Sequence, residues 1–203
     1  MSAHANILLI DSDAAAGREL SSLLLDRPGP PHIFISLGVM PARHLLASET
    51  IDWLFIRISE WDNYQLVAAS MKFPAPRVIF LSGRSEKCTD HLGFILDAHL
   101  QAPYRPSHLI KCWNKLSALD FTPRPLDFFF LKTKARYIPI RYRDLKQVRR
   151  VYHELHIQTR QAEYRIAAGL AAFQARLPIP LVRVRRGLLV NEAYEGHDGA
   201  QTY

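Results

Sequence analysis

The sequence of 203 residues has only two cysteines and no long hydrophobic run. Cys88 and Cys112 lie 24 residues apart, without the close spacing of a metal-binding pair. This favours free thiols in a reducing compartment over a disulfide framework or a zinc site. The longest apolar stretch, residues 166–173, is far shorter than the roughly 18 residues that a membrane helix needs. We therefore expect a cytoplasmic protein with neither a membrane span nor a signal peptide.

Excess charge is confined to one half of the chain. Residues 1–120 contain 11 lysines and arginines against 12 aspartates and glutamates, whereas residues 121–203 contain 15 against 7. A basic half beside a neutral half is typical of a module that binds nucleic acid or a membrane surface. Because the basic residues are spread over strand-like segments and not along one amphipathic helix, the pattern favours nucleic acid over a membrane.

A proline-containing segment separates the two halves. Residues 122–125 read Thr-Pro-Arg-Pro and follow an apolar, helix-like stretch, which is typical of a linker. We therefore expect a first domain at residues 1–118, a linker at 119–126 and a second domain at 127–203.

Short apolar runs alternate with amphipathic segments along the first domain. Alternating strands and helices predict an α/β fold with a parallel sheet, and continuously hydrophobic strands indicate helices on both faces. We expect a doubly wound, five-stranded sheet whose ligand crevice lies at the carboxyl ends of the strands. The expected strands cover residues 6–10, 32–37, 53–58, 77–81 and 98–101, and the expected helices cover 14–25, 41–48, 63–72, 87–97 and 106–116.

Polar residues stand at the predicted crevice. In chain order, the strand ends carry Asp11 and Asp13, then Arg57, Ser82 and Ala102. Their order and spacing resemble the receiver domain of bacterial response regulators over most of the first half. In that family an acidic pair binds magnesium and an aspartate at the end of the third strand accepts a phosphoryl group. A Ser or Thr and a lysine then contact the phosphoryl group.

The resemblance implies a degenerate crevice, because Arg57 stands at the acceptor position and Ala102 replaces the lysine. An arginine can be neither a carboxylate nucleophile nor a metal ligand. Its guanidinium forms bidentate pairs with carboxylates, so we favour an internal pair with Asp11 or Asp13 over an arginine that points into solvent. For Ser82 we favour a strand-end hydroxyl bound to the backbone over a working switch. We expect no metal and no cofactor in the crevice.

The second domain is predicted to be mostly β, with one helix. Its apolar segments are short and rich in aromatic and branched residues, and a single alanine-rich stretch at 168–177 ends before a proline. The expected strands cover residues 128–131, 135–140, 155–159, 163–167, 181–185 and 188–190.

The sequence of residues 183–191, Arg-Val-Arg-Arg-Gly-Leu-Leu-Val-Asn, resembles the LytTR DNA-binding domain. Earlier segments, His153 to Thr159 among them, occur in the same order as in that family. The resemblance implies a β domain that contacts double-stranded DNA through loops. The family normally continues with a further hairpin, so we expect a C-terminally shortened domain whose open edge favours a homodimer or association with another regulator.

Basic residues in this domain are the candidate DNA contacts. The resemblance places Arg185, Arg186 and the loop around Tyr152 and His153 against DNA, and arginine is the usual bidentate partner of guanine. For Arg183 the polar face of a strand is an equal alternative. Further basic residues are candidates for phosphate contacts, or for a solvated basic face, namely Arg143, Lys146, Arg149 and Arg150.

These features predict an atypical, phosphorylation-independent response regulator that binds promoter DNA. The alternative is a regulator that docks on another regulator or a kinase without productive DNA binding. An enzyme is not expected, because no nucleophile, base and oxyanion site assemble in the sequence and no glycine-rich phosphate loop is present.

Overall fold

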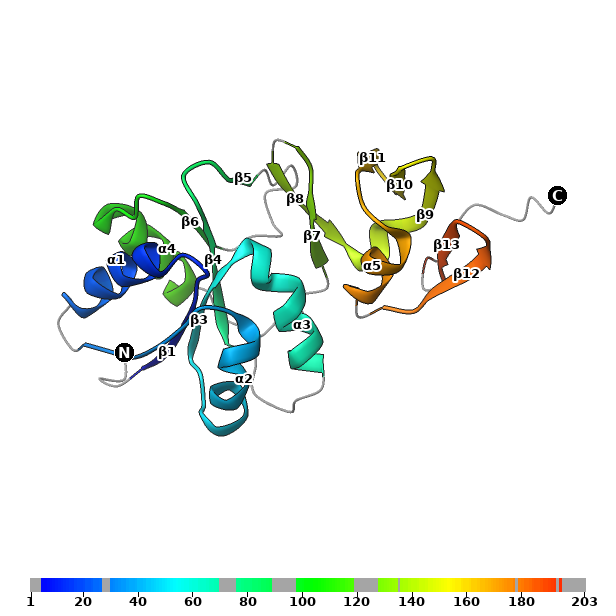
Figure 1. Cartoon of the computed structure of the whole chain (residues 1–203). Helices are drawn as coiled ribbons and strands as arrows, with labels where there is room; N and C mark the ends of the chain where they lie inside the picture. The colour runs from blue at the N-terminus through cyan, green and yellow to red at the C-terminus, as the bar shows by residue number, and fades with distance from the viewer. Residues whose placement is uncertain are drawn as a thin grey trace.

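The first half of the chain forms a five-stranded parallel sheet with helices on both faces (Figure 1). The computed structural model describes residues 5–26, 30–69, 76–88, 98–118, 128–134, 136–177, 179–192 and 194. The strand order β2-β1-β3-β4-β6 is that of flavodoxin-like doubly wound sheets, so the predicted fold is confirmed. The strands are β1 (Asn6–Ile10), β2 (His32–Ser36), β3 (Trp53–Arg57), β4 (Arg77–Ser82) and β6 (His99–Gln101).

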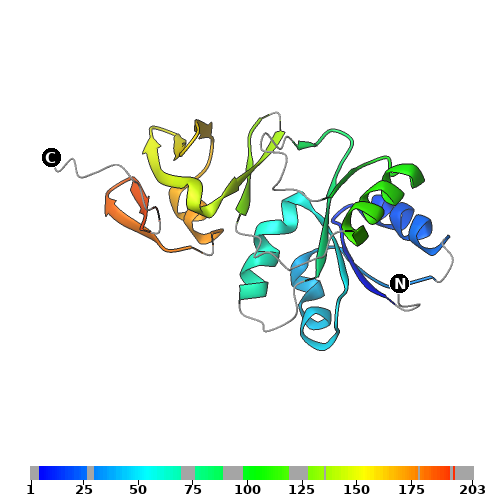
Figure 2. The same ribbon diagram turned by 180° about the vertical axis from the view of Figure 1, so that it is seen from behind.

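Both faces of this sheet are buried, as the continuously apolar strands predict. Alternate strand residues such as Leu9 and Phe55 pack against α1 (Ala14–Leu25) and α4 (Pro106–Ala118), which Figure 2 shows on the same side of the sheet. The intervening residues pack against α2 (Val39–Ser48) and α3 (Trp61–Ala69) on the other face. No helix among the described residues is long and apolar enough to cross a membrane.

One helix prediction is partly wrong. Residues 87–97 are expected to be helical, but Lys87–Cys88 form the short strand β5. This strand pairs in parallel with β8 (Arg136–Arg141) of the second half, and β8 pairs with β7 (Phe128–Lys132) to make a three-stranded sheet. Tertiary pairing with a distant segment therefore overrides the local helical pattern at the first two positions. Residues 89–97 lie outside the described ranges.

The second half is β-rich and its core contains a single α-helix among the described residues, α5 (Leu170–Ala175). An antiparallel sheet has the order β11-β10-β9-β13-β12, and α5 covers one of its faces (Figure 1). The sequence does not predict β9, which is the central strand of this sheet, because its two buried residues are three positions apart and do not alternate. The strands are β9 (Leu145–Val151), β10 (Glu154–Thr159), β11 (Glu163–Ile166), β12 (Leu181–Arg185) and β13 (Leu188–Asn191).

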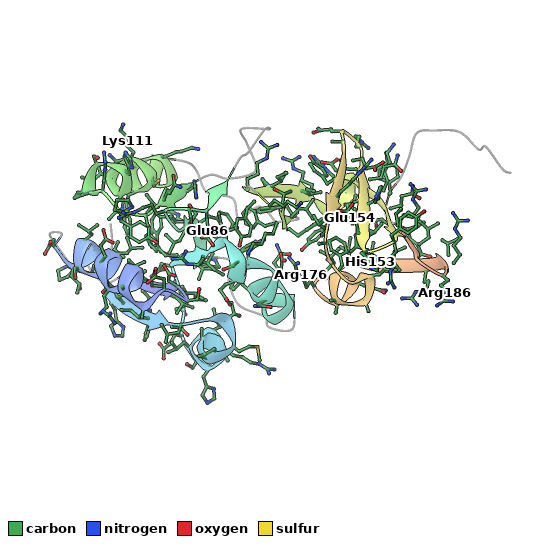
Figure 3. All side chains as sticks on the ribbon, turned by 45° about the horizontal axis from the view of Figure 1, so that its top comes forward. Glu86, Lys111, His153, Glu154, Arg176 and Arg186 are labelled. Atoms are coloured by element: carbon green, nitrogen blue, oxygen red, sulfur yellow. The ribbon has the colours of Figure 1, made fainter. Side chains whose placement is uncertain are left out.

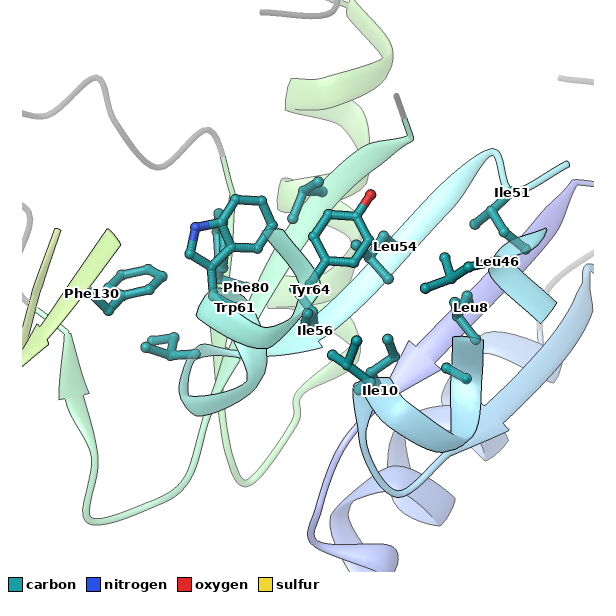
Figure 4. Packing of buried hydrophobic residues seen from close by; sticks show 14 of the residues in the cluster. Leu8, Ile10, Leu46, Ile51, Leu54, Ile56, Trp61, Tyr64, Phe80 and Phe130 are labelled. Carbon is teal, nitrogen blue, oxygen red and sulfur yellow. The ribbon is translucent and has the colours of Figure 1, made fainter. Parts of the chain in front are cut away.

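Strand β7 belongs to the cores of both halves. Phe128 and Phe130 point to one side and pack with Trp61 and Phe80, as Figure 4 shows for Phe130. Phe129 and its neighbour Leu131 point to the other side, into the core beneath the antiparallel sheet. Because side chains alternate along a strand, one apolar run of four residues is buried on both faces.

Helix α3 covers the free edge of β7. The indole N–H of Trp61 and the side-chain amide of Gln65 both donate to the carbonyl oxygen of Phe128, at 3.0 and 2.9 Å. Beside them, the carboxylate of Asp62 pairs with Arg176, which follows α5 (Figure 3). These contacts satisfy edge groups that would otherwise be open to another strand.

The division at residues 119–126 stays a prediction, since that segment lies outside the described ranges.

Candidate functional sites

The crevice at the carboxyl ends of the parallel strands holds a buried ion pair. Arg57, at the end of β3, donates from Nε to Oδ1 of Asp11 at 2.5 Å and from Nη2 to Oδ2 at 3.1 Å. Arg57 is 6% exposed and Asp11 is 1% exposed. The internal pair expected from the sequence is therefore confirmed, and the partner is Asp11. Burial acts to lower the pKa of the guanidinium, but the hydrogen bond and charge of Asp11 outweigh it and the pKa is raised.

The acceptor sites of Asp11 are all used within the protein. Besides Arg57, the backbone N–H of Asp13 donates to Oδ1 at 2.8 Å, and the hydroxyl of Tyr104 donates to Oδ2 at 3.3 Å. A carboxylate offers about four lone-pair sites, and four donors occupy them here. A magnesium ion would need some of these oxygens and would lie against a guanidinium. The residues of this crevice therefore do not fit the metal that the receiver resemblance implies.

A second carboxylate closes the outer side of the crevice. Glu86, in the loop after β4, accepts from Nη1 of Arg57 at 2.9 Å and from the backbone N–H of Gly83 at 2.7 Å. Gly83 leaves little space there, since a Cβ on it would lie 3.0 Å from Nη1 of Arg57. The guanidinium thus links β1, β3 and the loop that leads into β5. Glu86 and Tyr104 are not predicted as site residues from the sequence, although both lie near carboxyl ends of predicted strands.

The remaining crevice residues have structural partners. Asp13 caps α1, because its Oδ1 accepts from the backbone N–H groups of Ala15 and Ala16 at 3.0 and 3.1 Å. The hydrogen bond from Ala16 is the main cause that lowers the pKa of Asp13. Ser82 is fully buried, and its hydroxyl lies 2.9 Å from Nε2 of His99. This partner is a side chain and not the backbone that we expected.

Ala102 follows β6, and its backbone N–H donates to the carbonyl oxygen of Ser82 at 3.0 Å. Its methyl group packs at the edge of the core on the α1 and α4 side. Burial lowers the pKa of His99, so its imidazole is neutral beside Ser82 at pH 7. Among the described residues, Arg57 is the permanent cation bound to Asp11, and the methyl group of Ala102 cannot contact a phosphoryl group as a lysine would.

Two turns with basic residues lie side by side at one end of the antiparallel sheet. The first joins β9 to β10 through Tyr152 and His153, and the second joins β12 to β13 through Arg186 and Gly187. The backbone N–H of Arg150, near the end of β9, donates to the carbonyl oxygen of Gly187 at 2.7 Å, so the strand that leads into the first turn contacts the second turn. Figure 3 shows His153 and Arg186 at the same end of the second half.

The first turn presents an aromatic side chain to solvent. Tyr152 has a φ of 53° and is 88% exposed. A positive φ suits a two-residue hairpin but costs a residue other than glycine about 1–2 kcal/mol. The Nε of Arg150 donates to the carbonyl oxygen of Tyr152 at 3.2 Å and helps to hold this conformation. Gly187, in the second turn, has a φ of 85°, which glycine adopts freely.

The other predicted DNA contacts divide into two groups. Arg149 and Arg185 are exposed on strands next to the turns. Arg143 and Lys146 lie at the opposite end of β9, and the ammonium of Lys146 lies 5.1 Å from the ring centroid of Tyr194. At about 3.3 Å per residue, Lys146 is roughly 13 Å from Arg150 along the strand. The structure therefore does not bring all seven predicted residues to one place.

Comparisons with known proteins give similar structures for both halves. No family model and no curated protein matches the sequence. A response regulator from Thermotoga maritima is 16% identical with a TM-score of 0.45, over 57% of this chain and 99% of its own length. A response regulator receiver protein from Burkholderia phymatum is 17% identical with a TM-score of 0.41, over 59% of this chain and 99% of its own.

The second half is similar to the LytTr DNA-binding domain of a putative methyl-accepting/DNA response regulator from Bacillus cereus. The identity is 20% and the TM-score is 0.28, over 32% of this chain. This chain spans 61% of the length of that domain. The similar structures are thus of the two kinds that the sequence motifs resemble, a receiver and a LytTR domain.

Proposed function

We propose that this protein is a transcription regulator that binds double-stranded DNA through its two adjacent turns and acts without aspartyl phosphorylation. The single observation that carries the proposal is the hydrogen bond from Arg150, at the end of β9, to Gly187 in the second turn, which holds the two turns at the same end of the sheet. It places Arg150, Tyr152, His153 and Arg186 together at an exposed end of a rigid sheet. Each hairpin tip is two strands wide and therefore suits the major groove, which is about 12 Å wide and admits a two-stranded β ribbon.

Three features of the turns support nucleic acid as the ligand. The cluster is basic, and its half of the chain carries most of the excess positive charge. An exposed tyrosine at a strained φ weakens stability and is therefore better explained by a ligand contact. Arg186 lies at a tip with no acidic partner among the described residues, so its guanidinium is available for guanine O6 and N7.

The closed crevice supports the second part of the proposal. Transfer of a phosphoryl group to an aspartate needs a carboxylate nucleophile and a cation that neutralises the developing charge. At the end of β3 this chain has Arg57, and the carboxylate of Asp11 is fully engaged. The parallel-sheet half is therefore proposed to act as a docking and orienting module.

Selection of bound DNA from a random pool by the full-length protein tests the proposal. We expect an enriched motif, and we expect Arg186→Ala to weaken binding to that motif by about 1–3 kcal/mol more than binding to random DNA. Arg183→Ala is the matched control, because Arg183 is also an exposed arginine of this hairpin but lies away from the tip. An unselected pool together with capture of another regulator would contradict DNA binding and favour the docking alternative.

The predicted association with a second copy or with another regulator stays a prediction. An enriched motif with two half-sites at a spacing of one helical turn would support a homodimer, because a two-fold axis in the protein generates a two-fold axis in its site.

A further inference from the structure

We propose that the outer face of the antiparallel sheet carries a second DNA contact, a row of basic side chains that crosses the five strands and binds phosphates of the duplex held at the turns. This inference rests on the proposed function and adds a phosphate-binding surface to it. The row takes one residue from each strand and is called the basic row below; its basic members are Arg165, His156, Arg149 and Arg185, and the apolar Leu188 lies between the last two.

The strand register defines the basic row. Directly opposite residues of an antiparallel pair have their side chains on the same face. Arg165 on β11 is opposite His156 on β10, and His156 is opposite Arg149 on β9. Arg149 is opposite Leu188 on β13, and Leu188 is opposite Arg185 on β12. The row therefore crosses the sheet from one edge to the other, with a register shift on β12 just before Arg185.

The basic row lies on the face away from the core. The neighbouring row through Val148, Ile157 and Leu189 is fully buried against α5 and the rest of the core. Side chains alternate along a strand, so the residues beside these three point to the opposite face. A hydrogen bond on that outer face, from Gln147 Nε2 to Gln158 Oε1 at 2.6 Å, shows polar side chains meeting there.

The dimensions of the row suit a DNA strand. Strands are spaced about 4.8 Å apart, so the row extends roughly 19 Å, a length over which one DNA strand carries about five phosphates. Two residue pairs separate Arg149 and His156 from the first turn, so its tip is three residues, roughly 10 Å, along the strand. A duplex that contacts the tips can therefore also lie along the row.

The charges of the row leave a net attraction for phosphate. Glu163 lies 2.8 Å from Nδ1 of His156 and 3.7 Å from Nε of Arg165, so it offsets part of the positive charge at one edge. Arg149 and Arg185 have no acidic partner among the described residues and are exposed. They form the stronger half of the row, next to the second turn.

Salt titrations of DNA binding by the full-length protein test the inference. The logarithm of the affinity falls linearly with the logarithm of the salt concentration, and each lost phosphate contact reduces the steepness of this slope by about 0.9. The slope of the triple variant R149A/R165A/R185A is therefore expected to be less steep by about 2.7. When the salt concentration is raised fourfold, the native protein therefore loses affinity by a factor about 40 times larger than the factor lost by the triple variant. The loss is the same for selected and random DNA, because phosphates carry no sequence information.

Arg183→Ala provides the matched control. Arg183 is exposed and lies two residues before Arg185 on β12, but the strand register shifts between them. Arg183 is therefore opposite Leu189, which faces the core, whereas Arg185 is opposite Leu188. We expect Arg183→Ala to leave the slope unchanged, while Arg185→Ala lowers it by about 0.9. Circular dichroism and the unfolding midpoint of each variant establish that the sheet is intact.

The outcomes separate this inference from the proposed function. Equal slopes for Arg183→Ala and Arg185→Ala, or an unchanged slope in the triple variant, would overturn the basic row while leaving binding at the turns in place. If Arg186→Ala lost specific binding but kept the native salt slope, that result would support DNA binding at the turns by itself. No binding of any DNA by the native protein at low salt would overturn the proposed function itself.

Discussion

At the scale of single residues, Arg57 decides the character of the crevice. Its guanidinium neutralises Asp11, contacts Glu86 and occupies the position where the receiver resemblance places a phosphorylated aspartate. The neighbouring Tyr104 hydroxyl completes the coordination of Asp11, and burial is the main cause that raises the pKa of this tyrosine. The crevice is thus filled by the protein's own charges.

We predict that the crevice does not accept phosphate from small phosphodonors. After treatment with acetyl phosphate and magnesium, intact-mass spectrometry is expected to find no aspartyl adduct, because among the described residues Asp11 and Glu86 are bound by Arg57 and Ala102 stands in place of a lysine. Arg57→Asp alone is expected not to restore efficient labelling, since Ala102 still provides no cation. Rapid labelling of an aspartate in either protein would contradict this prediction.

Removal of the guanidinium is predicted to destabilise the fold. Arg57→Met leaves Asp11 as an uncompensated buried charge and is expected to lower the free energy of unfolding by about 3–5 kcal/mol. The double variant Asp11→Asn/Arg57→Met removes both charges and is expected to regain much of that loss. Urea unfolding at pH 7 measures both values. Equal losses in the single and double variants would show that packing, and not charge, is responsible.

Asp62 makes the contact between α3 and Arg176 sensitive to pH. Burial is the largest influence on this carboxyl and raises its pKa above 3.8, although Arg176 acts to lower it. Arg176→Ala removes the lowering influence, so the folded-state pKa rises further and the ionised form becomes a cost to folding. The loss of stability, about 2–3 kcal/mol at pH 7, is expected to shrink as the pH falls and Asp62 is protonated.

Thermal unfolding of this variant between pH 4 and pH 8 checks the prediction. The double variant Asp62→Asn/Arg176→Ala is the control, and its difference from the native protein is expected to vary much less with pH. A loss in Arg176→Ala that is constant over this range would mean that Asp62 is not the titrating group.

At the scale of secondary-structure elements, β7 determines how the two halves are joined. Its four apolar residues alternate between two cores, and the carbonyl oxygen of Phe128 is bound by two donors from α3. The short strand β5 adds a second connection through its pairing with β8. An element buried on both faces and covered at one edge leaves little freedom for relative movement.

We predict that substitutions on either side of β7 are costly. Phe130→Ala opens a cavity beside Phe80, and Phe129→Ala opens one beside Phe173. Each is expected to lower the free energy of unfolding by about 3–5 kcal/mol. Lys132→Ala, at the exposed end of the same strand, is the control and is expected to cost less than about 1 kcal/mol. Urea unfolding provides the comparison, and a small effect of Phe130→Ala alone would argue against the shared core.

At the scale of the whole molecule, the shared core couples a nearly neutral half to a basic half. The parallel sheet supplies most of the buried apolar surface, and the antiparallel sheet presents the basic turns at its far end (Figure 1). The coupling means that the first half holds the surface proposed to bind DNA in one orientation. Under the proposed function, the parallel sheet therefore has a role that requires no phosphorylation.

We predict that the two halves unfold together. All three tryptophans lie in the first half, so their fluorescence reports on the parallel sheet, while hydrogen exchange of β9 and β10 reports on the antiparallel sheet. The two probes are expected to give coincident urea midpoints in the native protein, because loss of one half exposes Phe128 and Phe130. Two separate midpoints would show that the halves are independent domains.

The sequence alone determines the parallel sheet and most of its boundaries. The strand at 6–10 and the helix at 14–25 agree with the structure residue for residue, since apolar periodicity and the Asp13 cap are local signals. The pairing of Arg57 with a carboxylate is also predictable, because opposite charges at neighbouring strand ends meet at one edge of a parallel sheet.

Tertiary structure decides what depends on contacts between distant segments. Strand β9 carries no alternating pattern and β5 carries a helical one, so both strands are defined by their pairing partners. The two-sided burial of β7 and the capping of its edge by α3 bring together residues more than 60 positions apart. The basic row, too, exists only because five strands adopt one register. Such features depend on long-range pairing, and local sequence patterns do not encode which segments pair.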